Sequence, residues 1–199
     1  ERPKRWSDLV TVLSYGATSA SVAALFHTGW FDLLVATVLG ALVGVLSIPA
    51  GNNVSFGQAF EAIAALIVAL LAAAVHGLWQ PLALNSVLIS ALIVLLPGLM
   101  LTTAVTELAA QHMVAGVARM AGAAAILLKL AFGTVAGLAI AKVFGWKLDN
   151  HLPVPVPAYA EWLALLLSSV AFAVLFRAAQ RDWLLVMASA WLGYGATRF

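Results

Sequence analysis

Residues 82–143 form an almost unbroken apolar stretch that nevertheless carries Glu107, Arg119 and Lys129. Charge is poorly tolerated in a segment of bilayer length, since a lysine at a helix centre costs about 2.5–3.5 kcal/mol on insertion scales. Charged groups that persist inside a membrane mark pathways and binding sites. The stretch therefore restricts the chain to a membrane protein and favours transport over simple anchoring.

The composition excludes several classes of protein. Hydrophobic residues make up 64% of the chain and charged residues 9%, whereas a soluble domain carries roughly 25% charged residues. The chain has no cysteine, which excludes disulfides and thiolate chemistry. A net charge of +2 gives no basic patch for nucleic acid. We therefore predict an integral, all-α membrane protein that lies in a lipid bilayer.

Seven apolar segments approach the length of about 20 residues that a helix needs to cross a bilayer. They predict a polytopic transmembrane helical bundle with about seven spans. The segments cover residues 9–26, 31–48, 56–75, 82–108, 114–143, 159–176 and 183–199.

Local signals mark the ends of some segments. Asp32 can cap the second helix, and Ser55 with Gln58 has the spacing of a capping box for the third. The alternating prolines of residues 153–157 favour an extended spacer.

The spacer predicts three parts: a first membrane unit of five helices over residues 1–147, a Pro-rich linker over 148–157, and the first two helices of a second unit over 158–199. The chain starts without Met and ends in an apolar stretch. We therefore expect a piece of a longer protein without a signal peptide.

The distribution of basic residues predicts a cytoplasmic N-terminus. In that orientation six loop residues are cytoplasmic, three lie on the other side, and Lys129 is within the membrane. The cytoplasmic six are Arg2, Lys4, Arg5, Arg119, Arg177 and Arg181, and the other three are Lys142, Lys147 and Arg198.

A weak internal repeat relates the two predicted units at an offset of 150 residues. The offset encloses five spans, an odd number, so the second copy would be inverted and incomplete; inverted repeats are frequent in secondary transporters. The matched pairs are Ser19/Ser169, Ala23/Ala173, Leu25/Leu175, Phe26/Phe176, Asp32/Asp182, Leu34/Leu184 and Leu42/Leu192.

Pro97 and Gly98 interrupt the fourth segment. Proline removes a backbone donor and clashes with the preceding turn. One interpretation is a packing kink; the other is a broken helix that exposes backbone groups to a substrate. Ser86 and Ser90 share a helical face that leads to this point.

Polar residues follow the break. Thr102, Thr103, Thr106 and Glu107 could hold a small zwitterion, or Glu107 could simply be solvated at the cytoplasmic interface. Arg119 could pair with Glu107, bind a substrate carboxylate in a bidentate way, or act as a positive-inside anchor.

Lys129 lies ten residues after Arg119, or about 15 Å along a helix. It shares a face with glycines, which favours contact with protein or a cavity over lipid. We predict a site for proton coupling or a substrate carboxylate, with Glu61 as a weaker candidate. The four histidines fall near predicted loops without metal-ligand spacing, so we expect no metal and no cofactor.

These residues resemble a known family. The run from Leu96 to Ala104, followed by Glu107-Leu108, Gly116 and Arg119, is similar to the signature of bacterial threonine/serine exporters. The resemblance extends to residues 29–32, to 172–176, and to Gly193-Tyr194-Gly195 with Arg198. It implies a secondary exporter of small hydroxylated amino acids in the bacterial inner membrane, driven by protons. It also implies two membrane parts, so the remainder of the protein or a partner subunit would be missing here.

We therefore predict a transporter rather than an enzyme, since no nucleophile–base pair or phosphate loop is evident. Its expected ligands are protons and threonine or serine, and a homo-oligomer is compatible with the sequence. The alternative from another class is a non-transporting assembly subunit whose charges hold helices together.

Overall fold

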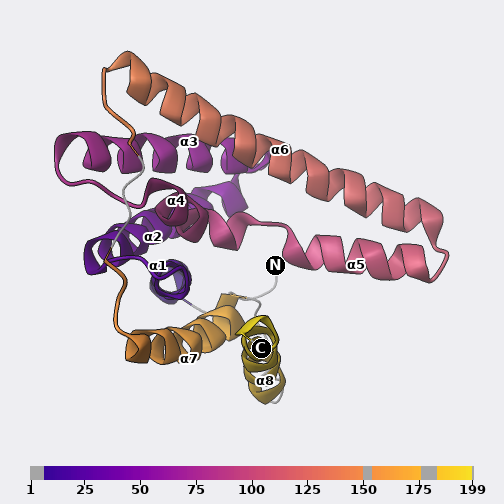
Figure 1. Cartoon of the computed structure of the whole chain (residues 1–199). Helices are drawn as coiled ribbons and strands as arrows, with labels where there is room; N and C mark the ends of the chain where they lie inside the picture. The colour runs from indigo at the N-terminus through magenta and orange to yellow at the C-terminus, as the bar shows by residue number, and fades with distance from the viewer. Residues whose placement is uncertain (1–6, 150–153, 176–182, 199) are drawn as a thin grey trace.

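The computed structural model describes residues 7–149, 154–175 and 183–198, and within these ranges the regular structure is helical. Each of the seven apolar segments forms helix, with the fourth divided (Figure 1). The elements are α1 (Asp8–Leu25), α2 (Trp30–Asn52), α3 (Val54–Leu78), α4 (Leu84–Leu92), the 3₁₀ turn η1 (Ile93–Leu95), α5 (Gly98–Ala109), α6 (Met113–Val143), α7 (Ala158–Leu175) and α8 (Trp183–Arg198).

Four of the described helices, α1, α2, α3 and α6, are long and apolar enough to cross a membrane. The pair formed by α4–η1 and α5 would be a fifth span, bent by 63° at its break. The remaining helices, α7 and α8, are apolar but shorter. The prediction of an all-helical multi-pass protein is thus confirmed for the described ranges, whereas the count of seven spans stays a prediction.

Helix ends follow capping rules, with one correction to the sequence-based expectation. The Gly29 N–H donates to Oδ2 of Asp32 at 3.0 Å, so Asp32 caps α2 as expected. The side chain of Asn53, not Ser55, accepts the first free N–H groups of α3. Asn53 is the N-cap because the α2–α3 connection is one residue long, so Ser55 already lies inside the helix.

The α1–α2 hairpin is closely packed through Gly40 and Gly44 of α2. A Cβ on Gly40 would collide with Ser19 of α1, and one on Gly44 would lie 3.0 Å from Val12 and Tyr15. The two antiparallel helices are so close here that α2 has no room for a side chain at positions 40 and 44.

Helices α3 and α6 pack side by side in the same direction (Figure 1). A Cβ on Gly133 would collide with the Ala62 carbonyl, and one on Gly137 would lie 2.6 Å from the Leu66 carbonyl oxygen. Both contacts join residues 71 positions apart. Parallel neighbours need a returning segment between them, so α4 and α5 together bring the chain back across the structure.

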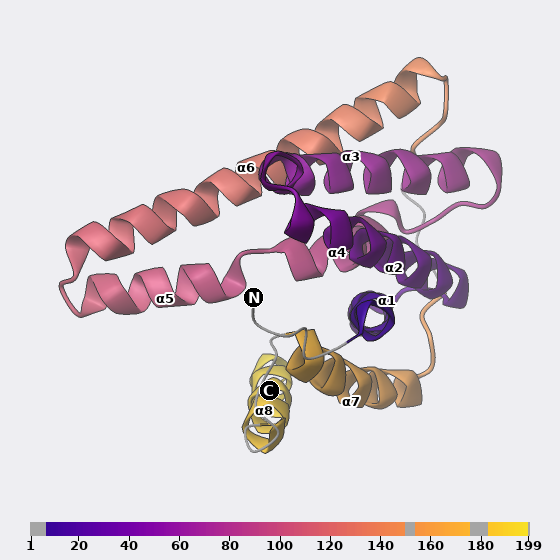
Figure 2. The ribbon, with the colours of Figure 1, turned by 180° about the vertical axis from the view of Figure 1, so that it is seen from behind.

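The α5–α6 hairpin extends past the other helices, as Figures 1 and 2 show from opposite sides. The offset of 71 places the first residue of α3 level with Ala125, so residues 113–124 of α6 continue for about 18 Å beyond it. Among the described helices, α5 packs extensively on α6 alone. We call residues 98–124 the arm.

Helix α7 packs on α1, and the Pro-rich segment before it is hydrogen-bonded to the α1–α2 turn. The Val156 N–H donates to the Thr28 carbonyl at 3.1 Å, and Val156 is buried with Ala24, Ala160 and Ala164. Pro153 lies outside the described residues, and the division into two membrane units stays a prediction. So does the inverted repeat, whose matched positions Phe176 and Asp182 also lie outside the described ranges.

Candidate functional site

The fourth apolar segment is interrupted at Leu96-Pro97-Gly98, where the structure has a break rather than a gentle kink. Leu96 is extended with ψ of 131° because the proline ring disfavours helical backbone in the residue before it. Pro97 is the N-cap of α5, and no side chain caps that helix. The Gly98 N–H donates to the Leu96 carbonyl at 2.8 Å, whereas the N–H groups of Leu99 and Met100 lack intrahelical acceptors.

A cavity of about 380 Å³ opens beside the break. It is lined on both sides of Pro97, from Ile93 to Met100, and by Phe172 and Leu175 of α7. This volume lies within the range of small-molecule sites. The break thus offers a mostly apolar pocket next to backbone groups that the helix does not satisfy.

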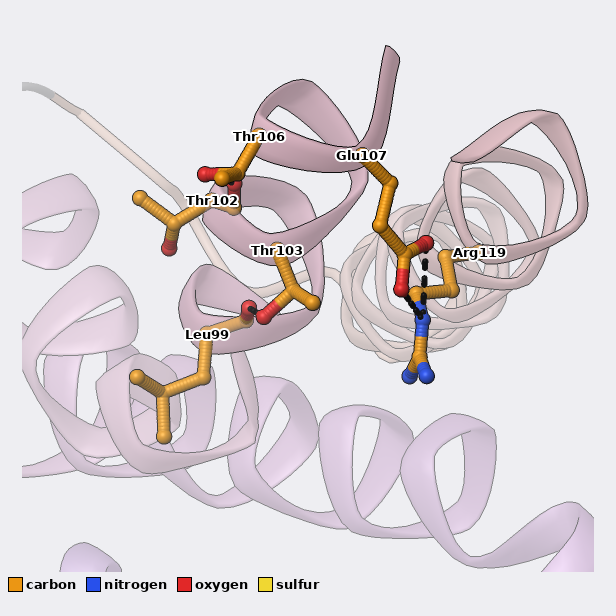
Figure 3. A network of polar contacts seen from close by, with 6 residues as sticks. All are labelled: Leu99, Thr102, Thr103, Thr106, Glu107 and Arg119. Carbon is orange, nitrogen blue, oxygen red and sulfur yellow. Dashed lines mark hydrogen bonds and ion pairs between the residues drawn. The ribbon is translucent and has the colours of Figure 1, made fainter. Parts of the chain in front are cut away.

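An ion pair joins the two helices of the arm (Figure 3). Nε of Arg119 lies 2.8 Å from Oε1 and 3.0 Å from Oε2 of Glu107. Gly116 permits this approach, since a Cβ there would lie 2.7 Å from the Leu108 side chain. Of the alternatives that the sequence left open, the structure has Arg119 paired with Glu107.

The Arg119 guanidinium uses only its Nε–H in this pair. Its two terminal amino groups point away from Glu107 in Figure 3, and within the described residues they have no hydrogen-bond partner. The side chain is 51% exposed, against 20% for Glu107. The pair therefore fixes the guanidinium and leaves its fork available to a second anion.

The three threonines donate their hydroxyls to their own helix. The acceptors are the carbonyls of Gly98, Leu99 and Thr102, at 2.6, 2.7 and 2.9 Å from Thr102, Thr103 and Thr106 respectively. Only Thr103 lies on the Glu107 side of α5 (Figure 3). The hydroxyl oxygens remain free to accept a hydrogen bond, but the three do not converge on Glu107.

Lys129 faces α3, as its position beside glycines predicted. Its Nζ donates to the Gln58 carbonyl at 2.7 Å and lies 3.5 Å from Oε2 of Glu61. The structure thus joins Lys129 to the weaker candidate Glu61. It leaves Arg119 in a separate place, ten residues or about 15 Å earlier on α6.

The register of α6 on α3 sets the level of Lys129, whereas its depth in a membrane stays a prediction. Lys129 lies level with the first two turns of α3, and its side chain is 40% exposed. Because the arm continues well past the start of α3, ten residues along α6 lead only to the level at which α3 begins.

Both serines before the break lie on α4. Ser90 is fully buried, and its hydroxyl has no hydrogen-bond partner, while Ser86 is half-buried. A buried, unsatisfied hydroxyl is costly, so Ser90 is a polar position inside the packing that leads to the break.

Sequence reasoning missed two polar clusters. Glu161 of α7 is buried and accepts from Tyr194 of α8 at 2.7 Å, and it lies 3.2 Å from Nδ1 of His27. The second cluster contains His76, which lies near a loop as predicted but is buried. Each histidine is next to a helix end in sequence, which predicts an interface; only the fold shows what packs on it.

Most of this chain resembles known proteins. Residues 1–141 match the model of a family described as "Putative threonine/serine exporter". The chain belongs to this family. The resemblance seen in the sequence is thereby confirmed over residues 1–141, and the chain is a multi-pass membrane protein of a transporter family.

Relatives in fungi share this region. "Pheromone-regulated membrane protein 10" of Debaryomyces hansenii is 29% identical over 157 residues, which is 76% of this chain and 15% of that protein. The protein of that name in Zygosaccharomyces rouxii is 30% identical over 162 residues, 77% of this chain and 16% of its own length.

An uncharacterized Schizosaccharomyces pombe protein is 27% identical over 202 residues, 95% of this chain and 24% of its own length. The chain therefore spans less than a quarter of these relatives. No solved structure matches it.

Proposed function

We propose that this family member is part of a secondary transporter that exports threonine and serine across a bacterial inner membrane, driven by the proton gradient. The observation that carries the proposal is the broken span beside a cavity of about 380 Å³. Interrupted helices supply backbone groups that bind polar ligands at the centre of many transporters.

The helix ends on the two sides of the break can each bind one of the charged groups of an amino acid, the carboxylate or the ammonium group. The uncapped first turn of α5 presents N–H groups and the positive end of the helix dipole, which favour a carboxylate. The carbonyls at the end of η1 point the other way along the chain and favour an ammonium group. The apolar lining then receives a small side chain such as that of threonine.

Arg119 is the best candidate for first recognition of the substrate. In the predicted orientation the α5–α6 turn is cytoplasmic, where export begins. The free fork of Arg119 matches a carboxylate in shape and charge. The Thr103 hydroxyl lies on the same side of α5 as Glu107 (Figure 3) and can accept from a substrate donor.

One observation favours the alternative of a non-transporting assembly subunit. Both charged pairs, Glu107 with Arg119 and Glu61 with Lys129, join neighbouring helices. Such pairs also hold helices together without any ligand. The two functions differ in whether a gradient moves an amino acid.

Inside-out membrane vesicles that contain the whole natural protein separate the two. We expect them to accumulate labelled threonine when respiration is energised, with serine as a competitor and loss of the label on addition of a protonophore. Vesicles that hold folded protein but show no gradient-dependent accumulation would favour the assembly subunit.

A further inference from the structure

The short connection between α3 and the broken span is held by two buried side chains. The Leu82 N–H donates to Nδ1 of His76 at 2.9 Å, and the next N–H, that of Ala83, donates to Oδ1 of Asp32 at 3.1 Å. Asp32 is 4% and His76 8% exposed. Two consecutive amides are thus fixed by two different helices, α2 and α3.

The two acceptors respond differently to a proton. His76 accepts at Nδ1, so its ring is neutral and carries its proton on Nε2. A second proton would occupy Nδ1 and turn that acceptor into a donor facing the Leu82 N–H. Asp32 accepts two backbone hydrogen bonds, from Ala83 and from Gly29, and a proton on one carboxylate oxygen would leave acceptor capacity on the carboxyl group.

The charged groups near His76 come from α2 and from the segment after α6. Asp32 is the charged group that shares the connection with it, from α2. Residues 79–83, the start of α4 and residues 154–157 carry no titratable side chain. The segment after α6, where Trp146 packs on Gly77, contributes Lys147 and Asp149, one of each sign.

Water can reach Asp32 from one side. A cavity of about 480 Å³ lies between the α1–α2 turn, the α3–α4 connection and the Pro-rich segment. Asp32, Gln80 and Pro81 contribute to its lining. In the predicted orientation it opens on the non-cytoplasmic side, from which a proton would enter during export.

We propose that Asp32 and His76 form a proton-binding site that controls the anchorage of the broken span. A proton on Nδ1 of His76 removes the acceptor of the Leu82 N–H and releases the start of α4, the helix that leads to the break at Pro97. The role of this release in coupling rests on the proposed export, whereas the proton site itself does not.

Hydrogen exchange of the Leu82 amide in the whole protein, reconstituted in nanodiscs, tests the site without any transport. After correction for intrinsic exchange rates, we expect about tenfold weaker protection of Leu82 at pH 5 than at pH 8. His76→Asn places a neutral, non-titrating acceptor where Nδ1 lies, so its protection should stay constant with pH. His112→Asn, which changes an exposed histidine of the arm, should behave like the wild type.

Protection that does not change with pH in the wild type would overturn the proposal, and this measurement decides even if His76→Asn fails to fold. Equal pH dependence in wild type and His76→Asn would also overturn it. A pH-dependent Leu82 amide in a protein that moves no threonine would leave the proton site standing and remove the proposed export. Active export together with pH-independent protection of the Leu82 amide would overturn the proton site and leave the proposed export standing.

Discussion

Arg119 contacts Glu107 through Nε alone, at 2.8 and 3.0 Å from the two carboxylate oxygens. This arrangement uses one donor to orient the guanidinium and leaves the terminal fork facing away. A pair that served only to join α5 and α6 would be at least as well served by the fork itself, which makes two parallel hydrogen bonds. Glu107 therefore fixes the orientation of the Arg119 guanidinium, whose two terminal amino groups can still bind another anion.

Arg119→Lys should weaken substrate recognition while retaining the positive charge. Lysine has no planar fork and no Nε–H, so it can pair with Glu107 or with a carboxylate but cannot orient itself between the two. We expect KM for threonine in inside-out vesicles to rise roughly tenfold with an unchanged amount of folded protein. Lys142→Arg, at the far end of α6, is the control; an unaltered KM in Arg119→Lys would remove Arg119 from recognition.

The glycines of α6 predict a stability difference that is independent of function. Gly133→Ala places a methyl group against the Ala62 backbone carbonyl, which cannot move aside as a flexible side chain could. We expect a loss of about 1–3 kcal/mol, as for other overpacked sites. Gly193→Ala on α8, where a Cβ meets nothing within 4 Å, should be neutral or stabilising by up to about 1 kcal/mol. Thermal unfolding followed by tryptophan fluorescence compares the two.

Local chemistry explains what the sequence predicted well. The apolar segments, the break at Pro97 and the close packing of the glycine face of α6 each depend on a few neighbouring residues. Proline lacks an N–H wherever it occurs, and glycine lacks a Cβ. Such features survive in any tertiary arrangement, so they can be predicted before the fold is known.

Other features depend on how elements are placed, and these escaped prediction. The level of Lys129 is set by the offset of 71 residues between α6 and α3, which no local pattern encodes. The burial of His76 depends on α2 and on the connection that folds over it. The pairing of Glu161 with His27 joins α7, which follows the Pro-rich segment, to the turn between α1 and α2.

The break predicts a separation of transport from folding. Pro97→Ala combined with Gly98→Ala restores a backbone donor and removes the preference of Leu96 for extended backbone. The 63° bend should decrease, which spin labels at Asn85 and Ala109 would detect as a longer distance. We expect transport per folded molecule to fall at least about tenfold, since the uncapped first turn of α5 disappears. Unchanged transport in a straightened helix would reduce the break to a packing kink.

Lys129→Met tests whether the α3–α6 ion pair is more than a contact between helices. The pair is partly exposed and its charged atoms are 3.5 Å apart, so its contribution to stability should be small, about 0.2–1 kcal/mol. If Lys129 serves coupling or substrate binding, gradient-driven export should be lost although the protein stays folded.

The partner variant Glu61→Gln and the double variant complete a cycle that separates these roles. A structural pair predicts that the double variant recovers the stability and the export lost in the single variants, because no unpaired charge remains. A coupling lysine predicts recovered stability without recovered export. Full export in Lys129→Met would exclude the lysine from the mechanism and leave Arg119 and the broken span to carry it.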